Sequence, residues 1–370
     1  MDKKTENQLA RMLYEIPGLG SKSLHKLYAK TQSMEGILEL SEEGTKNLIG
    51  KDILSPVQRE YKNDKEGFLK RMPKINPPVS FVFYGDEDYP KRLKSLVDAP
   101  FGLYYCGRLP KEDCPTVSII GARECSEYGR KAAELFGKTL AGYGVSVISG
   151  MARGIDGISQ RAALSVGGES FGILGSGVDI CYPKENLPLY EALKQKGGLI
   201  SEYPPGTEAK STHFPMRNRI ISGLADILLV VEARQKSGTY ITICQALEQG
   251  KEIFAVPGRI TDGLSDGCNR IIAQGAGIAI NPMAILDQLN LKSDRTPVKE
   301  GRKAEKTGEG YSLSGILRVL EDTPKSLEEI QESLGHLGID FSHTDLMCKL
   351  TDLCIEGRVE GIGNYYRKIG

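Results

Sequence analysis

Glycine, serine and arginine recur at predicted turns in the middle of the sequence, and this combination suits an anionic ligand. The first turn, residues 121–123, follows an apolar strand and precedes a helix, as in a dinucleotide-binding unit. In such units further glycines let a pyrophosphate touch bare backbone, whereas here Arg123 occupies the mouth of the turn. A guanidinium binds phosphate oxygens through two parallel hydrogen bonds, and a helix N-terminus adds positive potential. The first turn therefore predicts a phosphate ligand.

Further predicted turns have the same chemistry, most of them with a lysine or an arginine, at residues 149–156, 175–186, 201–206, 214–221 and 237–239. A single glycine is more often an ordinary turn, but a series of such turns at one sheet edge favours a phosphate-bearing chain or a nucleotide. The predicted contacts are Gly121, Ala122, Arg123, Ser149, Gly150, Arg153, Gly175, Ser176, Gly177, Lys184, Asn186, Phe214, Arg217 and Asn218.

The segment 214–221 contains two arginines two residues apart, which point to different faces of a helix. We expect Arg217 to face the ligand and Arg219 to support the turns by pairing with Asp156 or Glu202. If the phosphate-bearing chain is a single-stranded nucleic acid, its splayed bases require planar side chains near the cations. The aromatic candidates are Phe214, Tyr182 and Tyr203, although each is equally well explained as a plug at the top of the sheet.

These turns require a doubly wound α/β framework. Short apolar strands alternate with longer helical segments through the central region, which indicates a parallel sheet covered by helices on both faces. Ligands of such sheets bind at the carboxyl ends of the strands, where the strand-to-helix turns meet. The pattern predicts an extended Rossmann-like sheet with a last strand at residues 277–281 and helices that start at Ser126, Ile155, Asn186, Asn218, Gly238 and Asp266.

Composition divides the chain into four parts. A helical domain is predicted for residues 1–75, the Rossmann-like domain for 76–290, a flexible charged linker for 291–310 and a winged-helix domain for 311–370. The length is consistent with several domains, because a chain of 370 residues is longer than chains that usually fold around a single hydrophobic core.

Bulk charge and cysteine usage restrict the class of protein. Lysine plus arginine equals aspartate plus glutamate at 48 each, so a polyanion would have to bind a local basic cluster. The 8 cysteines are scattered, which favours reduced thiols over zinc ligands or disulfides. With no bilayer-spanning apolar run and a polar N-terminus, a cytoplasmic protein without membrane attachment, metal or cofactor is expected.

The flanking regions contain two candidate DNA-binding motifs. "IPGLGSKSLHKLYAK" fits a helix-hairpin-helix, in which Gly18, Gly20 and Lys22 would contact a DNA phosphate; a packing hairpin is an equally good interpretation. In the C-terminal part, Ser326 and Glu329 form a capping-box pattern. The third helix of that part is rich in acidic residues, so base-specific readout of duplex DNA is not expected.

Several central segments together resemble the DNA-processing protein A (DprA, or Smf) family. They include "YPKRLKSLVDAPFGLYYCG", "SGMARGID", "GSGVDICYPKEN", "FPMRNRIISGL", "IFAVPG" and "GCNRIIAQGA", in the family's order. The resemblance implies a cytoplasmic, non-enzymatic homodimer that binds and protects single-stranded DNA and loads RecA recombinase during natural transformation. It also implies that Arg123 and Lys184 contact the DNA backbone. The family's usual GSR turn has Ala122 here, which removes a hydroxyl but keeps the amides and the guanidinium.

Contacts for the implied homodimer are less evident from the sequence. Ile271 and Ile272 could be exposed to a partner near the far edge of the sheet. Because one of two adjacent isoleucines on a helix can face the sheet, core packing is the more common interpretation.

An enzyme acting on nucleotides is the alternative function. The fold also resembles nucleotide phosphoribohydrolases, whose PGGxGTxxE run has a catalytic glutamate, but the matching position here is Thr242. Glu232 keeps hydrolase chemistry open, while Asp156 and Asp179 are better explained as loop-ordering acceptors than as general bases. A nucleotide-sensing module is a further alternative, and it would not need a groove for a long strand.

Overall fold

The structure is a computed structural model, and it describes residues 2–235, 237–291, 316–317, 319–320, 324–336, 341–356, 358–362 and 365–368. The predicted linker, 291–310, lies outside the described residues except for its first position. The chain forms two compact units, Met1–Lys299 and Glu300–Gly370.

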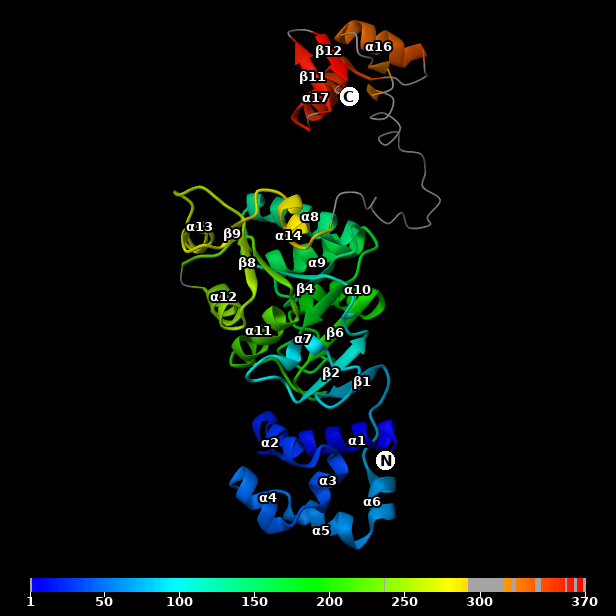
Figure 1. Cartoon of the computed structure of the whole chain (residues 1–370), viewed down its shortest axis with the longest axis vertical. Helices are drawn as coiled ribbons and strands as arrows, with labels where there is room; N and C mark the ends of the chain where they lie inside the picture. The colour runs from blue at the N-terminus through cyan, green and yellow to red at the C-terminus, as the bar shows by residue number, and fades with distance from the viewer. Residues whose placement is uncertain are drawn as a thin grey trace. The chain divides into compact units, whose positions relative to one another are not determined.

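The first unit is built on a nine-stranded sheet with the order β1-β2-β6-β5-β4-β3-β7-β8-β9 (Figure 1). From β6 to β9 neighbouring strands are parallel, which confirms the α/β fold with a mainly parallel sheet. The strands are β1 (Val79–Phe83), β2 (Gly102–Gly107), β3 (Thr116–Ile120), β4 (Ser146–Ser149), β5 (Ser170–Ile173), β6 (Gly197–Ser201), β7 (Ile227–Val230), β8 (Glu252–Ala255) and β9 (Gly277–Ile278).

The edge strands depart from the sequence prediction. β1 and β2 pair antiparallel with each other, and β2 also pairs antiparallel with β6. The alternating pattern did not identify these two strands, because β-strands joined to their neighbours without crossover helices lack that signature. The last strand, β9, is shorter than predicted and contains two residues.

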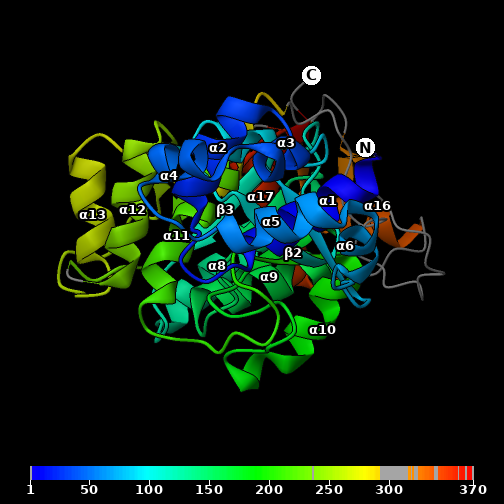
Figure 2. The same ribbon diagram turned by 90° about the horizontal axis from the view of Figure 1, so that it is seen from below.

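Helices cover both faces of the sheet (Figure 2). Hydrophobic side chains of α7, α11, α12 and α13 form one core against it, and those of α8, α9 and α14 form another. These helices and the short 3₁₀ helix η1 are α7 (Lys91–Lys94), α8 (Glu127–Gly142), α9 (Ile155–Ser165), η1 (Lys184–Asn186), α10 (Leu187–Lys196), α11 (His213–Leu224), α12 (Gly238–Glu248), α13 (Asp266–Ala273) and α14 (Pro282–Gln288).

The predicted helix starts agree with the structure except at α11. Ser126 is the N-cap of α8, and its side chain accepts a hydrogen bond from the Gly129 amide. However, α11 begins at His213, so the predicted start at Asn218 is wrong. The prediction placed Pro215 in a preceding loop, but proline is tolerated in the first turn of a helix, where amides have no intrahelical acceptor.

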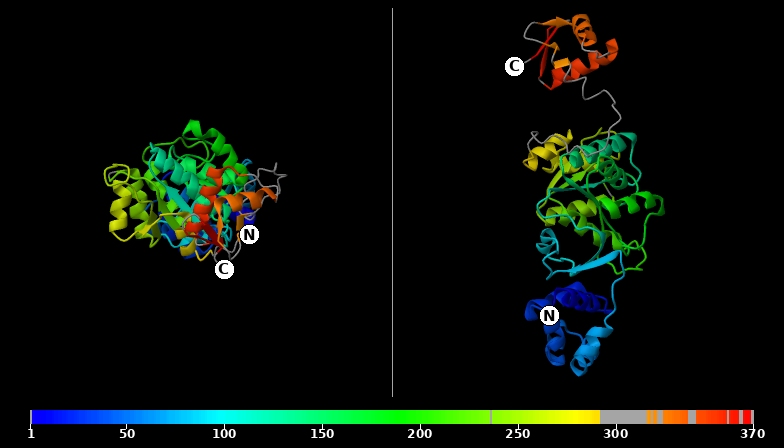
Figure 3. Two further views of the ribbon diagram at one scale, coloured as in Figure 1. Left: turned by 90° about the horizontal axis from the view of Figure 1, so that it is seen from above. Right: turned by 90° about the vertical axis from the view of Figure 1, so that its right-hand side faces the viewer.

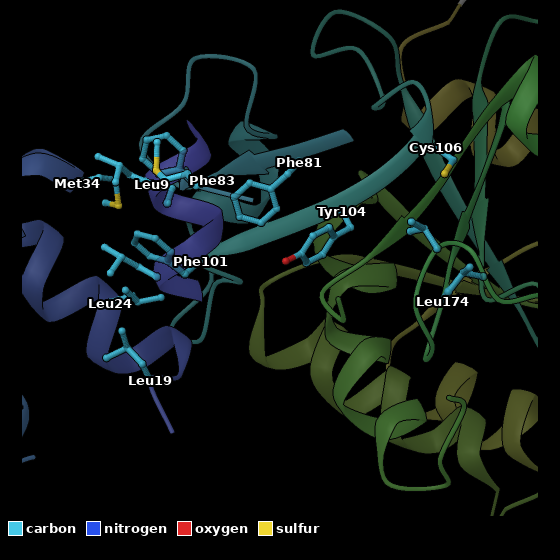
Figure 4. Close-up of a cluster of buried hydrophobic side chains, with 14 of the residues drawn as sticks. Leu9, Leu19, Leu24, Met34, Phe81, Phe83, Phe101, Tyr104, Cys106 and Leu174 are labelled. Atoms are coloured by element: carbon cyan, nitrogen blue, oxygen red, sulfur yellow. The ribbon is translucent and has the colours of Figure 1, made fainter. Parts of the chain in front are cut away.

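The N-terminal region is helical, as predicted, and it shares a core with the sheet (Figures 3 and 4). Leu9, Leu24 and Met34 belong to the same buried cluster as Phe81 and Tyr104 on the antiparallel strands. The boundary between the predicted first and second domains stays a prediction, since both lie in one compact unit. The helices are α1 (Lys3–Tyr14), α2 (Ser21–Thr31), α3 (Met34–Glu39), α4 (Glu42–Ile49), α5 (Ser55–Asn63) and α6 (Lys65–Arg71).

The second unit has its own hydrophobic core and a three-stranded antiparallel sheet in the order β10-β12-β11. The predicted capping box is confirmed, because the Glu329 carboxylate accepts from the Ser326 amide at 2.7 Å and the Ser326 hydroxyl from the Glu329 amide at 3.3 Å. The described elements are β10 (Lys325–Ser326), α16 (Leu327–His336), α17 (His343–Ile355), β11 (Val359–Ile362) and β12 (Tyr365–Lys368). The winged-helix assignment stays a prediction.

Across the described residues, no helix is long and apolar enough to cross a membrane.

Candidate nucleic-acid interface

A cleft of about 680 Å³ opens at the carboxyl ends of β3 and β7, where the sequence predicted the ligand. The first turn, the start of α11 and the start of α12 form its walls. Of the predicted contacts, those that line the cleft are Gly121, Ala122, Arg123, Phe214, Arg217 and Asn218.

An exposed arginine lies beside an aromatic surface in this cleft. The Arg123 guanidinium carbon is 5.7 Å from the centre of the Phe214 ring, and the Tyr182 ring lies 5.5 Å from the same ring at an angle of 30°. Tyr182 is half exposed. Among the described residues Arg123 forms no ion pair, so the cleft has an available positive charge next to an aromatic surface.

Arg217 has the same charge but a different environment. It is 5% exposed at the floor of the cleft and donates hydrogen bonds to the carbonyl oxygens of Gly150, at 2.9 Å, and Ile173. Burial lowers the pKa of Arg217 to about 10, while the nearby Asp156 carboxylate opposes that shift. Burial likewise raises the pKa of Asp156, and Arg217 opposes that rise. The two charges therefore hold the turns together, and Arg217 offers the ligand little surface.

The predicted support by Arg219 is confirmed on the neighbouring face of α11. Its Nη2 donates to the Glu202 carboxylate at 2.8 Å, and its Nε donates to Asp98 at 2.9 Å. The partner is thus Glu202, one of the two acids that the sequence suggested.

The start of α12 contributes cleft residues that the predicted contacts omitted. Arg234, Ser237, Gly238 and Thr239 line the cleft. Ser237 is the N-cap, yet its Oγ atom is buried without a hydrogen-bond partner within the described structure. The sequence could have predicted this wall of the cleft from the turn at residues 237–239. It could also have predicted Arg234, a cation that lies four residues after the end of β7.

From the second and third glycine turns only Ala152, Asp156 and Tyr182 line the cleft, and the contacts predicted in these turns lie behind it. Their polar groups already have partners within the fold. The Ser149 hydroxyl donates to the Ile119 carbonyl at 2.6 Å, the Gly150 amide to Asp156 at 3.1 Å, and the Ser176 hydroxyl to the Ile180 carbonyl at 3.1 Å. Six of the predicted contacts in these turns are buried, namely Ser149, Gly150, Gly175, Ser176, Gly177 and Asn186.

The remaining predicted contacts of these turns divide into buried and exposed groups. The Gly177 amide donates to the Thr207 carbonyl at 2.8 Å, and the Asn186 side chain donates to the Met151 carbonyl at 3.0 Å, which ties η1 to the second turn. Lys184 and Arg153 are exposed on these same turns, and Arg153 is paired with Glu185. None of these residues lines the cleft, so a contact between them and a ligand stays a prediction.

The carboxylates considered as catalytic bases are occupied by structural hydrogen bonds. Glu232 is 2% exposed and accepts from the amide of Ser126, at 2.9 Å, and from its hydroxyl. Asp156 accepts from the Gly150 amide, and Asp179 from the Gly206 amide at 2.9 Å, as the loop-ordering interpretation expected. Thr242, the position that the sequence resemblance matched to the catalytic glutamate of phosphoribohydrolases, lines the cleft.

The peripheral candidates have separate locations. Gly18, Gly20 and Lys22 line a second groove beside α2. Ile271 is 4% exposed and packs in the core, so its predicted exposure to a partner is wrong, whereas Ile272 is partly buried at the edge of that core. On α13 one isoleucine has to face the sheet, and that one is Ile271.

Comparisons with known proteins point to one family. The family model described as DNA recombination-mediator protein A matches residues 80–290. The DNA processing protein DprA of Streptococcus pneumoniae is 38% identical over 232 residues, which cover 62% of this chain and 80% of that protein. Protein Smf of Escherichia coli is 42% identical over 204 residues, which cover 55% of this chain and 54% of that protein.

Solved structures extend this likeness to three dimensions. The X-ray structure of DNA processing protein A from Streptococcus pneumoniae aligns with a TM-score of 0.65 at 32% identity, covering 76% of this chain and 97% of that one. A structure of the Helicobacter pylori protein, described for its single-stranded DNA binding mode, aligns with a TM-score of 0.53 at 29% identity, covering 58% of this chain and 96% of that one.

Proposed function

Because the chain belongs to the DNA recombination-mediator protein A family, we propose that it binds single-stranded DNA in the cleft between the first turn, α11 and α12. The observation that carries this proposal is the free Arg123 guanidinium beside the Tyr182 and Phe214 rings. A phosphodiester chain supplies both a phosphate for the arginine and a base for the rings, whereas a duplex keeps its bases stacked inside.

The cleft offers phosphate contacts on two sides. Arg123 and Ala122 lie on one side, and on the other lies the start of α12, where the Ser237 hydroxyl has no hydrogen-bond partner among the residues that the structure describes. Helix N-termini attract anions, and α12 has no side-chain cap to compete with a phosphate. Lys184 and Arg153, exposed on the turns behind the cleft, extend this surface for a longer strand.

The finer cellular role that we propose follows the family. The protein would protect incoming single-stranded DNA in the cytoplasm and load RecA recombinase onto it during natural transformation, acting as a homodimer without catalysis. The structural hydrogen bonds of Glu232 and the presence of Thr242 in the cleft favour binding over hydrolysis.

Fluorescence anisotropy of labelled oligothymidylate and of a matched duplex, across a salt series, tests the binding proposal. We expect the single strand to bind more tightly, with an affinity that falls linearly in log salt. Arg123→Glu combined with Lys184→Glu should weaken binding at least about tenfold and flatten the salt dependence, because two phosphate contacts are lost.

The matched control is Lys138→Glu with Lys196→Glu, which makes the same change in net charge at exposed positions on α8 and α10 outside the cleft. It should bind as the wild type does. Equal losses in both double variants would indicate a nonspecific charge effect, and unchanged binding in the Arg123 variant would refute the site. Turnover of a free nucleotide by the wild type would favour the enzyme alternative.

A further inference from the structure

A second groove lies between α11 and the N-terminal hairpin, by which we mean residues 16–30, which contain the turn before α2 and most of α2 itself. It has a volume of about 840 Å³. Lys22, Lys26 and Lys51 line it, together with the apolar side chains of Val97 and Met216. Val97 is fully exposed and Met216 is half exposed. A cationic wall with exposed apolar side chains is suited to a polymer that has both charged and planar parts.

The charge in this groove is available to a ligand. Its two carboxylates, Asp98 and Glu202, are both paired with Arg219. Lys22 and Lys26 lie one turn apart on α2, and within the described ranges neither forms an ion pair. The three lysines and Arg219 exceed the two carboxylates, so the groove keeps a net positive charge.

The start of α2 has no capping side chain of its own, but the Glu202 carboxylate lies beside it. Gly20 is its N-cap, no side chain caps the helix, and its first turn contains no acidic residue. The positive charges of lysines near this helix N-terminus interact unfavourably with the helix dipole, whereas the negative charge of a bound anion would interact favourably with it. An independent observation comes from the opposite wall, where Arg219 is 5% exposed and its Nη1 atom is buried without a partner in the described structure. An anion in the groove could satisfy that donor.

The hairpin has a fixed position relative to α11. The Tyr14 hydroxyl donates to the Glu202 carbonyl at 2.9 Å, and the Phe101 amide donates to the Ser21 hydroxyl at 3.3 Å. The His25 Nε2 atom lies 2.9 Å from the Ala99 carbonyl oxygen. The Glu202 carboxylate accepts from the Ser21 hydroxyl at 3.4 Å and also pairs with Arg219, so this one carboxylate joins the two walls of the groove.

The two ligand surfaces meet at α11. Phe214 and Arg217 line the cleft, while Met216 and Arg219 line the groove. We propose that a single-stranded DNA that fills the cleft continues around the exposed start of α11 into the groove. There the backbone phosphates lie along Lys22 and Lys26, and a base lies on Val97 and Met216. This inference rests on the proposed function and extends its binding surface.

Tryptophan fluorescence can follow both surfaces, because the chain contains 0 tryptophans. Val97→Trp reports on the groove and Tyr182→Trp on the cleft. Oligothymidylates of about 4 and about 16 nucleotides bracket the usual length of one binding site. We expect the short oligomer to quench only Tyr182→Trp and the long oligomer to quench both.

Charge variants then test the assignment. Lys22→Glu with Lys26→Glu should weaken binding of the long oligomer about tenfold and abolish the quenching of Val97→Trp, while the short oligomer binds as before. The control, Lys30→Glu with Lys46→Glu, makes the same charge change at exposed positions outside the groove and should keep wild-type binding. Thermal unfolding of each variant verifies its fold.

The outcomes separate the two proposals. Quenching of Tyr182→Trp by the long oligomer, without quenching of Val97→Trp and with equal affinities in both charge variants, would overturn the groove proposal and leave the cleft intact. Absence of quenching at both positions would overturn the proposed function and the groove together.

Discussion

At the scale of single residues, burial gives identical side chains different roles. Arg123 is exposed and unpaired within the described structure, so its charge is available to a ligand. Arg217 is 5% exposed and bonded to two backbone carbonyls, so its charge is used within the fold. A substitution at Arg123 should therefore change binding, and one at Arg217 should first change stability.

We predict that Arg217→Met lowers the free energy of unfolding by about 3 kcal/mol, because it leaves the buried Asp156 carboxylate without the opposing charge. Adding Asp156→Asn should recover part of this loss, since the uncompensated charge is then removed. Denaturant unfolding of both variants measures the effect. Arg123→Glu is the control, and it should unfold as the wild type does; a double variant no more stable than Arg217→Met would contradict the coupling.

At the scale of elements, the conformation of the first glycine turn, residues 121–123, depends on Gly154 in the second glycine turn, residues 149–156. Gly154, the N-cap of α9, has a φ angle of +70°, which L side chains rarely adopt. An added Cβ would lie 2.2 Å from the Ala122 carbonyl oxygen and 2.5 Å from that of Arg123. The start of α9 thus packs directly against the turn that positions Arg123.

Gly154→Ala should therefore weaken single-stranded DNA binding, because the clash displaces the first turn, and should lower stability by at least about 1 kcal/mol. Anisotropy and thermal unfolding measure the two effects. Gly142→Ala on α8 is a suitable control, because its Cβ would meet no atom within 4 Å and alanine favours a helix. Wild-type binding by Gly154→Ala would show that the first turn tolerates the displacement.

At the scale of the whole molecule, the two units have separate cores, while the N-terminal helices share theirs with the sheet. Phe81, Phe101 and Tyr104 pack in that shared core beside Leu9 and Leu24 (Figure 4). Removing the second unit leaves these contacts unchanged. Removing the N-terminal helices would expose the aromatic side chains to water.

A fragment of residues 1–299 should keep the wild-type affinity for short oligothymidylate, since it contains the complete cleft. A fragment of residues 76–299 should unfold at a clearly lower temperature, because it lacks half of the shared core. Anisotropy and calorimetry of the two fragments measure these properties. An equal unfolding temperature for both would show that the N-terminal helices add no stability to the sheet.

The amino-acid sequence by itself determined the local features of this protein. Apolar strands alternating with helices predicted the mainly parallel sheet, and the Ser126 and Ser326 caps predicted two helix starts. The glycine turns predicted the sheet edge at which the cleft opens. These features depend on neighbouring residues, whose periodicity and hydrogen bonding are visible along the chain.

Only the tertiary structure decided which of these turns reach the ligand surface. The sequence predicts Ser176 and Arg217 near strand-to-helix turns, but Arg217 lies within α11, and the burial of both residues depends on segments far away in the chain. The antiparallel edge strands and the docking of the N-terminal helices are likewise set by long-range contacts. Burial and pairing arise only when distant elements meet, and for that reason Arg123 is exposed while Arg217 is buried and bonded to backbone carbonyls.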